Sequence, residues 1–181
     1  MRFRELSVAG ARLIETAVQQ DDRGSFCRIW CAEEFRDAGL PATLSQASLS
    51  GNVRRGTLRG MHYRPAEEGE YKLVRCVRGS VVDVVLDLRP DSPTLLSWDA
   101  VTLSAADRHA LCIPPGCAHG FLTLEDDTVL LYMMSVPYRP GVERGVRWND
   151  PAFGILWPSK PEVIASRDAA YPDYVGPSPP P

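Results

Sequence analysis

The feature that most constrains the fold of this chain is a series of short apolar segments between residues 44 and 136, each ended by turn-forming residues. The first two lie within residues 72–89, are rich in valine and leucine, and are separated by Gly79. Turns between segments are supplied by proline, glycine and aspartate, as at Pro114-Pro115-Gly116. Four further segments of the same kind lie at residues 94–103, 110–116, 118–124 and 128–136. Strands of this length and spacing predict an all-β sandwich or barrel.

Outside this series, the sequence predicts only small additions to the β structure. The first thirty residues are extended and polar in character, with a turn at residues 21–24. Residues 31–40 are the best candidate for a helix, because acidic residues come early in the segment and Gly39 can terminate it. A short helical turn is expected within residues 162–170.

Length, charge and hydropathy limit the classes of protein to consider. A chain of 181 residues suffices for one domain, which we place at residues 1–176, with a disordered proline-rich tail at residues 177–181. The net charge of −3 provides no general attraction for nucleic acid or for an anionic membrane. The sequence has neither a signal-peptide core nor an apolar run of ~18 residues. A cytoplasmic protein without nucleic-acid or membrane partners is therefore expected.

One histidine lies among several cations. His62 is part of the stretch G-T-L-R-G-M-H-Y-R-P, and the sequence around it holds Arg59, Arg64, Lys72 and Arg75. A neutral imidazole titrates near the working pH, which suits a proton-transfer base. Clustered cations in a cleft suit a phosphate group. The alternatives are that His62 is a metal ligand, or that these residues form a solvated basic face without a function.

A metal site is the second interpretation of the histidines. Residues 114–119 match P-x-G-x-x-H, one half of the metal-binding pattern of cupins, but in the other half Arg64 stands where a second histidine belongs. Two histidines without a third protein ligand make a poor transition-metal site, so no metal is predicted. Taken alone, His119 fits a core or turn histidine as well as it fits a functional one. Tyr132 fits a core phenol or, facing a cavity, the acid opposite a histidine base.

Six motifs, taken together, resemble the dTDP-4-dehydrorhamnose 3,5-epimerase family, over a region from about residue 21 to about residue 173. In chain order they are R-G-T-L-R-G-M-H-Y, K-L-V-R-C-V-R-G, V-V-L-D-L-R-P-D-S-P, I-P-P-G-C-A-H-G-F, L-L-Y and E-R-G-V-R-W-N-D-P-A-F-G-I-L-W-P. The resemblance implies a cupin-type jelly-roll β-barrel with a few short peripheral helices, no cofactor, and a homodimer. It also implies a nucleotide-diphosphate sugar as substrate. The implied reaction inverts C3, C5 or both of a 4-keto-6-deoxy sugar by removing a proton next to the ketone.

The resemblance further implies roles for individual residues. His62 matches the family's base, Asp168 the carboxylate paired with it, and Tyr132 the acid on the other face of the sugar. Lys72 matches the lysine near the keto oxygen. The remaining matches contact sugar, phosphate or nucleotide, and they are Arg23, Phe26, Gln46, Arg59, His119 and Tyr138.

Two positions depart from the family pattern, both on the side of ligand recognition. Arg28 stands where members usually have glutamate, and Ser48 stands where they tend to have asparagine. The nucleotide (dTDP, CDP or GDP) and the number of inverted carbons therefore stay open. A metal-dependent cupin oxygenase and a non-catalytic sugar-binding cupin also stay open. The joint presence of a base, its carboxylate, an opposing acid and a lysine favours the epimerase.

Overall fold

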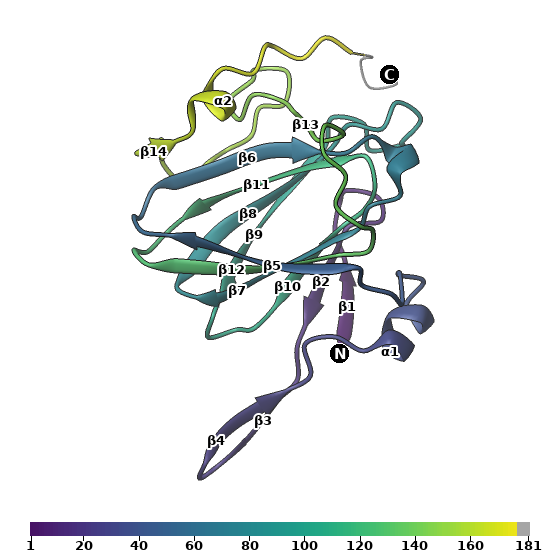
Figure 1. Ribbon diagram of the computed structural model, residues 1–181, viewed down its shortest axis with the longest axis vertical. Helices are drawn as coiled ribbons and strands as arrows, with labels where there is room; N and C mark the ends of the chain where they lie inside the picture. Colours follow the sequence, from purple (N-terminus) through teal and green to yellow (C-terminus); the bar gives the residue numbers. More distant parts are fainter. Residues whose placement is uncertain (177–181) are drawn as a thin grey trace.

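A computed structural model describes residues 1–176, and the long strands form two antiparallel sheets that face each other (Figure 1). The expected tail at 177–181 lies outside the described residues. The first sheet has the strand order β1 (Arg2–Glu5), β2 (Arg12–Glu15), β10 (Ala110–Ile113), β7 (Lys72–Arg78), β12 (Thr128–Met134), β5 (Gln46–Asn52). The second has the order β13 (Arg144–Gly145), β6 (Thr57–Tyr63), β11 (Cys117–Thr123), β8 (Ser80–Asp87), β9 (Trp98–Ser104).

The main hydrophobic core lies between the two sheets. Val74 and Leu130 come from the first sheet, Val85 and Phe121 from the second, and all four are at most 1% exposed. Alternate residues of each strand point to the same face, so every second side chain of these strands enters this layer. Strands β7 and β8 meet at Gly79, whose φ of +75° suits glycine. The all-β jelly roll with short peripheral helices is confirmed.

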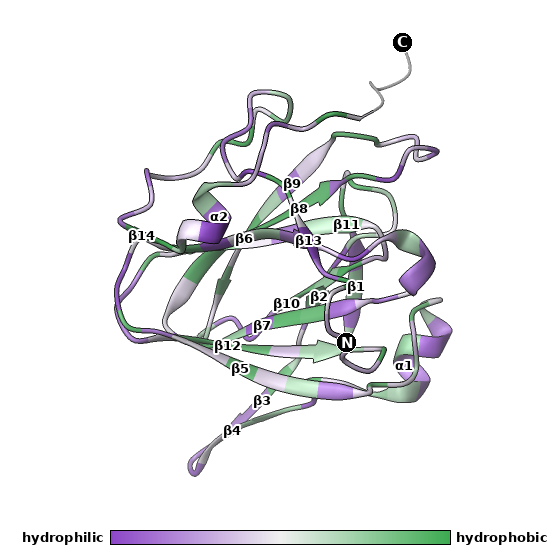
Figure 2. Cartoon of the chain, turned by 45° about the horizontal axis from the view of Figure 1, so that its top comes forward, coloured by the Kyte–Doolittle hydropathy of each residue, from purple (hydrophilic) through white to green (hydrophobic). Residues whose placement is uncertain are grey.

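Short additional elements attach to the outside of the sheets. Helix α1 (Ala32–Asp37) lies within the predicted helix and packs Phe35 against the outer face of the first sheet. Strands β3 (Val18–Asp21) and β4 (Gly24–Cys27) form a hairpin around the predicted turn. This hairpin projects away from the sheets (Figure 1), and its tip is hydrophilic (Figure 2).

The C-terminal region crosses the second sheet and brings one acidic residue to it. Strand β14 (Val163–Ile164) pairs in parallel with β6, and helix α2 (Ser166–Ala169) follows at once. Helix α2 forms the predicted helical turn and contacts β6 (Figure 1). Asp168 on this helix is 2% exposed. A 3₁₀ turn, η1 (Ala66–Glu68), connects β6 to β7.

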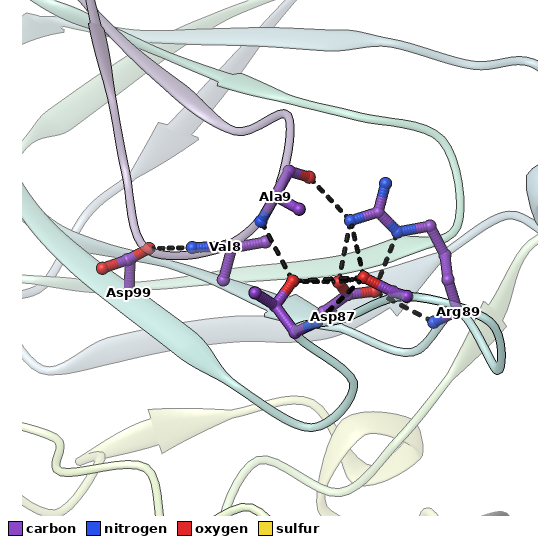
Figure 3. A network of polar contacts seen from close by, with 7 residues as sticks. Val8, Ala9, Asp87, Arg89 and Asp99 are labelled. Carbon is purple, nitrogen blue, oxygen red and sulfur yellow. Dashed lines mark hydrogen bonds and ion pairs between the residues drawn. The ribbon is translucent and has the colours of Figure 1, made fainter. Parts of the chain in front are cut away.

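A buried polar network ties the N-terminal segment to the β8–β9 connection (Figure 3). Asp87 is fully buried and accepts hydrogen bonds from Arg89, Ser92 and Thr94. Thr94 Oγ1 in turn accepts a hydrogen bond from the backbone N–H of Ala9, at 3.0 Å. Burial alone would raise the pKa of Asp87, but the hydrogen bonds outweigh it and lower the pKa to about 2.

Replacing this carboxylate should destabilise the fold without touching the site described below. We expect Asp87→Asn to lower the free energy of unfolding at neutral pH by about 3 kcal/mol, because the buried Arg89 contact loses its counter-charge. The lowered pKa means that the stabilisation is complete above the unfolded-state pKa and is lost as pH falls toward 2. Urea titrations at pH 7 and pH 3 should therefore show a smaller difference between variant and wild type at pH 3. The exposed Asp91→Asn is the matched control, and equal midpoints for all three proteins at pH 7 would contradict the expectation.

Candidate active site

A cavity of about 330 Å³ opens between the two sheets and gathers most of the residues singled out from the sequence. Seven of the ten residues predicted to act in catalysis or binding line it: Gln46, Arg59, His62, Lys72, His119, Tyr132 and Tyr138. Ser48 lies in the same lining, as does Arg64, one of the cations that the sequence groups around His62. Four further lining residues were not predicted: Ser50, Glu70, Met134 and Glu143. Both sheets contribute, so a ligand in the cavity is contacted from two sides.

His62 is held by a carboxylate that is distant in the sequence. It lies on β6, and its Nε2 is 2.8 Å from Oδ1 of Asp168 on α2. The other oxygen, Oδ2, accepts a hydrogen bond from the backbone N–H of Gly60 at 3.1 Å. Burial of Asp168 opposes ionisation, but hydrogen bonds from His62, Gly60 and Arg167 hold its pKa below the ordinary value. An ionised Asp168 accepts the Nε2 proton of a neutral imidazole, which leaves Nδ1 as the nitrogen able to take a proton.

A second histidine–aspartate pair lies beside the first. His119 on β11 is paired with His62 in the register of the two strands, and its Nε2 contacts Oδ1 of Asp83 on β8. His119 is 4% exposed and Asp83 is fully buried. Oδ2 of Asp83 has no hydrogen-bond partner among the described residues. The sequence carries a local signal for Asp83, because a carboxylate inside the apolar run S-V-V-D-V-V-L needs a buried partner.

Tyr132 faces the histidines from the opposite sheet. Its ring stands edge-on to that of His119, with centroids 5.8 Å apart. Burial, followed by the nearby Asp83 carboxylate, raises the pKa of Tyr132 well above its ordinary value. The phenol therefore stays protonated at neutral pH and is available as an acid. Of the two interpretations of this residue, the structure supports the one in which it faces a cavity.

Two of the cations that the sequence groups around His62, Lys72 and Arg75, lie on opposite faces of the first sheet. Lys72 lines the cavity, but Arg75, three residues further along β7, is 2% exposed and lies outside it. Arg75 donates hydrogen bonds to Thr16 Oγ1 and to the backbone carbonyl of Ile29, at 3.0 and 3.2 Å. Grouping Arg75 with the cations of the site was wrong, because residues separated by an odd number of positions in a strand point to opposite faces.

Arg23 and Phe26 lie apart from this cavity. Both are on the β3–β4 hairpin, where they line a different hollow formed by the hairpin itself. Phe26 is 73% exposed. Arg28, at the base of the hairpin, pairs with Glu34 at 3.0 Å. Within one copy of the chain, the hairpin residues therefore make no contribution to the cavity lining.

The arrangement suits proton transfer at carbon more directly than it suits metal chemistry. An imidazole oriented by a carboxylate and a protonated phenol contact one cavity from opposite sheets, and Lys72 lies in the same lining. Across residues 1–176, no group of three or more histidine, cysteine, aspartate or glutamate residues is arranged to hold a metal ion. In the same part of the chain, no helix is both long and apolar enough to span a membrane.

Comparison with known proteins identifies the family. Residues 5–175 match the family model described as dTDP-4-dehydrorhamnose 3,5-epimerase. The dTDP-4-dehydrorhamnose 3,5-epimerase of Mycolicibacterium smegmatis is 44% identical over 174 residues, covering 95% of this chain and 85% of that protein.

Two solved structures agree with this assignment. An epimerase of Mycobacterium tuberculosis superposes with a TM-score of 0.90 at 38% identity, covering 96% of this chain and 88% of that one. A 3'-monoepimerase of Streptomyces bikiniensis, in complex with dTDP-quinovose, superposes with a TM-score of 0.87 at 36% identity, covering 93% and 85%. The chain therefore belongs to the dTDP-4-dehydrorhamnose 3,5-epimerase family and is an isomerase, an epimerase of nucleotide-linked sugars.

Proposed function

We propose that this enzyme inverts one or both carbons next to the C4 ketone of a dTDP-linked 4-keto-6-deoxy sugar, with His62 as the base and Tyr132 as the acid. The observation that supports this most directly is that the carboxylate-oriented imidazole and the protonated phenol line one cavity from opposite sheets. Inversion needs a proton to leave one face of the carbon and another to arrive on the opposite face. The imidazole of His62 on one sheet and the phenol of Tyr132 on the other supply one group for each face.

The chemistry follows from the acidity of carbon next to a carbonyl. Nδ1 of His62 takes the C–H proton, and the electron pair moves through the carbon–carbon bond onto the ketone oxygen, giving an enolate. Lys72 stabilises the negative charge on that oxygen, and Asp168 stabilises the imidazolium. Tyr132 then gives its proton to the carbon from the other side as the ketone re-forms. Proton exchange with water returns both residues to their starting forms.

Ligand binding is assigned to the remaining residues of the lining. Arg59 and His119 contact the sugar and diphosphate, while Gln46 and Tyr138 contact the sugar and nucleotide. A dTDP sugar is the preferred ligand because the S. bikiniensis relative binds dTDP-quinovose and the family model is described by a dTDP sugar. Arg28 and Ser48 keep a CDP- or GDP-linked sugar as the alternative to be tested beside it.

The working form is a homodimer. Exposed apolar side chains support this on two elements at the edge of the molecule: Phe26 on the hairpin and Leu49 on the edge strand β5, which are 73% and 70% exposed. A second copy would cover these side chains and could bring Arg23 and Phe26 of its own hairpin to the cavity. Light scattering at micromolar concentration tests this directly, and a monomer would contradict it.

The test of the reaction is exchange of carbon-bound hydrogen with solvent. We expect NMR of dTDP-, CDP- and GDP-linked 4-keto-6-deoxy sugars in D₂O to show enzyme-dependent deuterium at C3, at C5 or at both with the dTDP sugar. Deuterium at both carbons identifies a 3,5-epimerase, and deuterium at C3 alone identifies a 3-epimerase. Binding without exchange for every sugar would identify a non-catalytic sugar-binding protein and refute the proposal.

A further inference from the structure

Three charged side chains of the cavity wall form a cluster with one carboxylate between two cations, here called the Glu70 triad. Oε1 of Glu70 is 3.1 Å from Nε of Arg64, and Oε2 is 3.2 Å from Nζ of Lys72. Arg64 and Glu70 are each 6% exposed, and the Lys72 side chain is 15% exposed. All three residues line the same cavity as His62.

The formal charges of the triad decide what it can do for a substrate. Glu70 alone beside Lys72 would give a neutral pair, and the carboxylate would offset the attraction of the ammonium for a negative oxygen. Arg64 adds a second cation to the same carboxylate, so the triad carries a net charge of +1. Arg64 is itself held in place, because Nη1 donates a hydrogen bond to the carbonyl of Pro137 at 3.3 Å. The geometry thus orients Lys72 without removing its positive field.

We propose that Glu70 is a positioning residue for Lys72 and that Arg64 compensates its charge, so that the ammonium is fixed and still attracts the enolate oxygen. This inference rests on the proposed function, in which Lys72 stabilises that oxygen. It assigns to the Arg64–Glu70 pair a role in the rate of proton removal rather than in packing. Buried ion pairs are weak sources of stability, so packing alone gives little reason for three charges here.

The triad predicts an unusual pattern of single and double variants. In Arg64→Gln, Glu70 pairs with Lys72 alone and neutralises it. In Glu70→Gln, one amide oxygen remains for two cationic donors, so Lys72 or Arg64 loses its partner. The double variant combines Arg64→Gln with Glu70→Gln. In it, the amide oxygen introduced at position 70 accepts a hydrogen bond from Lys72. The N–H₂ group of the same amide donates to the amide oxygen introduced at position 64, and the net charge is again +1.

The experiment measures kcat and KM for deuterium exchange of the dTDP-linked sugar, together with the dissociation constant of dTDP. We expect each single variant to lose about tenfold or more in kcat. The double variant should return to within about threefold of wild type, with dTDP affinity changed by less than about threefold throughout. Glu68→Gln is the control, since Glu68 lies on the nearby η1 turn and pairs with Arg139, and neither residue belongs to the cavity lining.

Three results would overturn the inference. Single-variant losses that multiply in the double variant would assign the pair to packing. Single variants that keep the wild-type kcat would exclude a role of the Arg64–Glu70 pair in the rate of proton removal. Arg64→Met makes the same change of charge with a side chain of similar length, and it replaces Arg64→Gln as the single variant should that protein be insoluble. A wild-type enzyme that exchanges no hydrogen with any sugar would refute the proposed function itself, and the inference with it.

Discussion

His62→Ala yields a folded protein whose deuterium exchange at C3 and C5 falls by about 10³-fold or more, because it removes the Asp168-paired imidazole that we propose as the base. Lys72 remains a cation beside Glu70, and the phenol of Tyr132 stays protonated because burial raises its pKa. His119 is engaged with Asp83 and is 4% exposed. NMR in D₂O with the dTDP-linked sugar measures the loss.

The matched control for this variant is His109→Ala. His109 is the remaining histidine of the chain and lies outside the cavity lining. Its removal should leave exchange unchanged, and circular dichroism should show the same melting behaviour for both variants. Exchange by His62→Ala at a rate near that of wild type would exclude His62 as the base, whatever the result for the control.

The β framework could be predicted from the sequence because each strand carries its own signal. Val74 and Val85 are core residues in segments rich in valine and leucine, and Gly79 marks the turn between those segments. The short helix ending before Gly39 likewise has a local signal. Where a residue's environment depends on its own few neighbours, inspection of the sequence is sufficient.

The site could not be built from local signals, because its parts meet only in the folded chain. Asp168 is 106 positions from His62, and its two-residue strand and four-residue helix are too short to show periodicity. Only the family resemblance pointed to it. Glu70 was accessible to local reasoning, because residues two apart in an extended segment share a face and Lys72 was already assigned to the cavity. The same rule, applied to Arg75, would have excluded it.

A glycine on β6 is expected to be as critical to the site as the side chains proposed to act in catalysis. Gly60 has φ of +139°, and a Cβ added there would lie 2.5 Å from Cα of Gly120 and 3.0 Å from the carbonyl oxygen of His119. The register of β6 and β11 shifts at this point. Both obstructing atoms belong to backbone, so no side-chain rotation can relieve the contact. The same residue donates its N–H to Oδ2 of Asp168, which links the packing of the strands to the orientation of the base.

Gly60→Ala should therefore lower the free energy of unfolding by about 3 kcal/mol or more, from overpacking of about 1–3 kcal/mol together with a backbone conformation that costs a non-glycine residue about 1–3 kcal/mol. Separation of β6 from β11 also moves His62, which is two residues further along the strand, so exchange should fall even in the fraction that folds. Gly51→Ala on the edge strand β5 is the control for stability, because its added Cβ meets no atom within 4 Å and its φ is not positive. Urea denaturation separates the two variants. Equal midpoints for Gly60→Ala and Gly51→Ala would mean that the close approach of the strands can be relieved, and equal exchange rates would mean that the position of His62 does not depend on it.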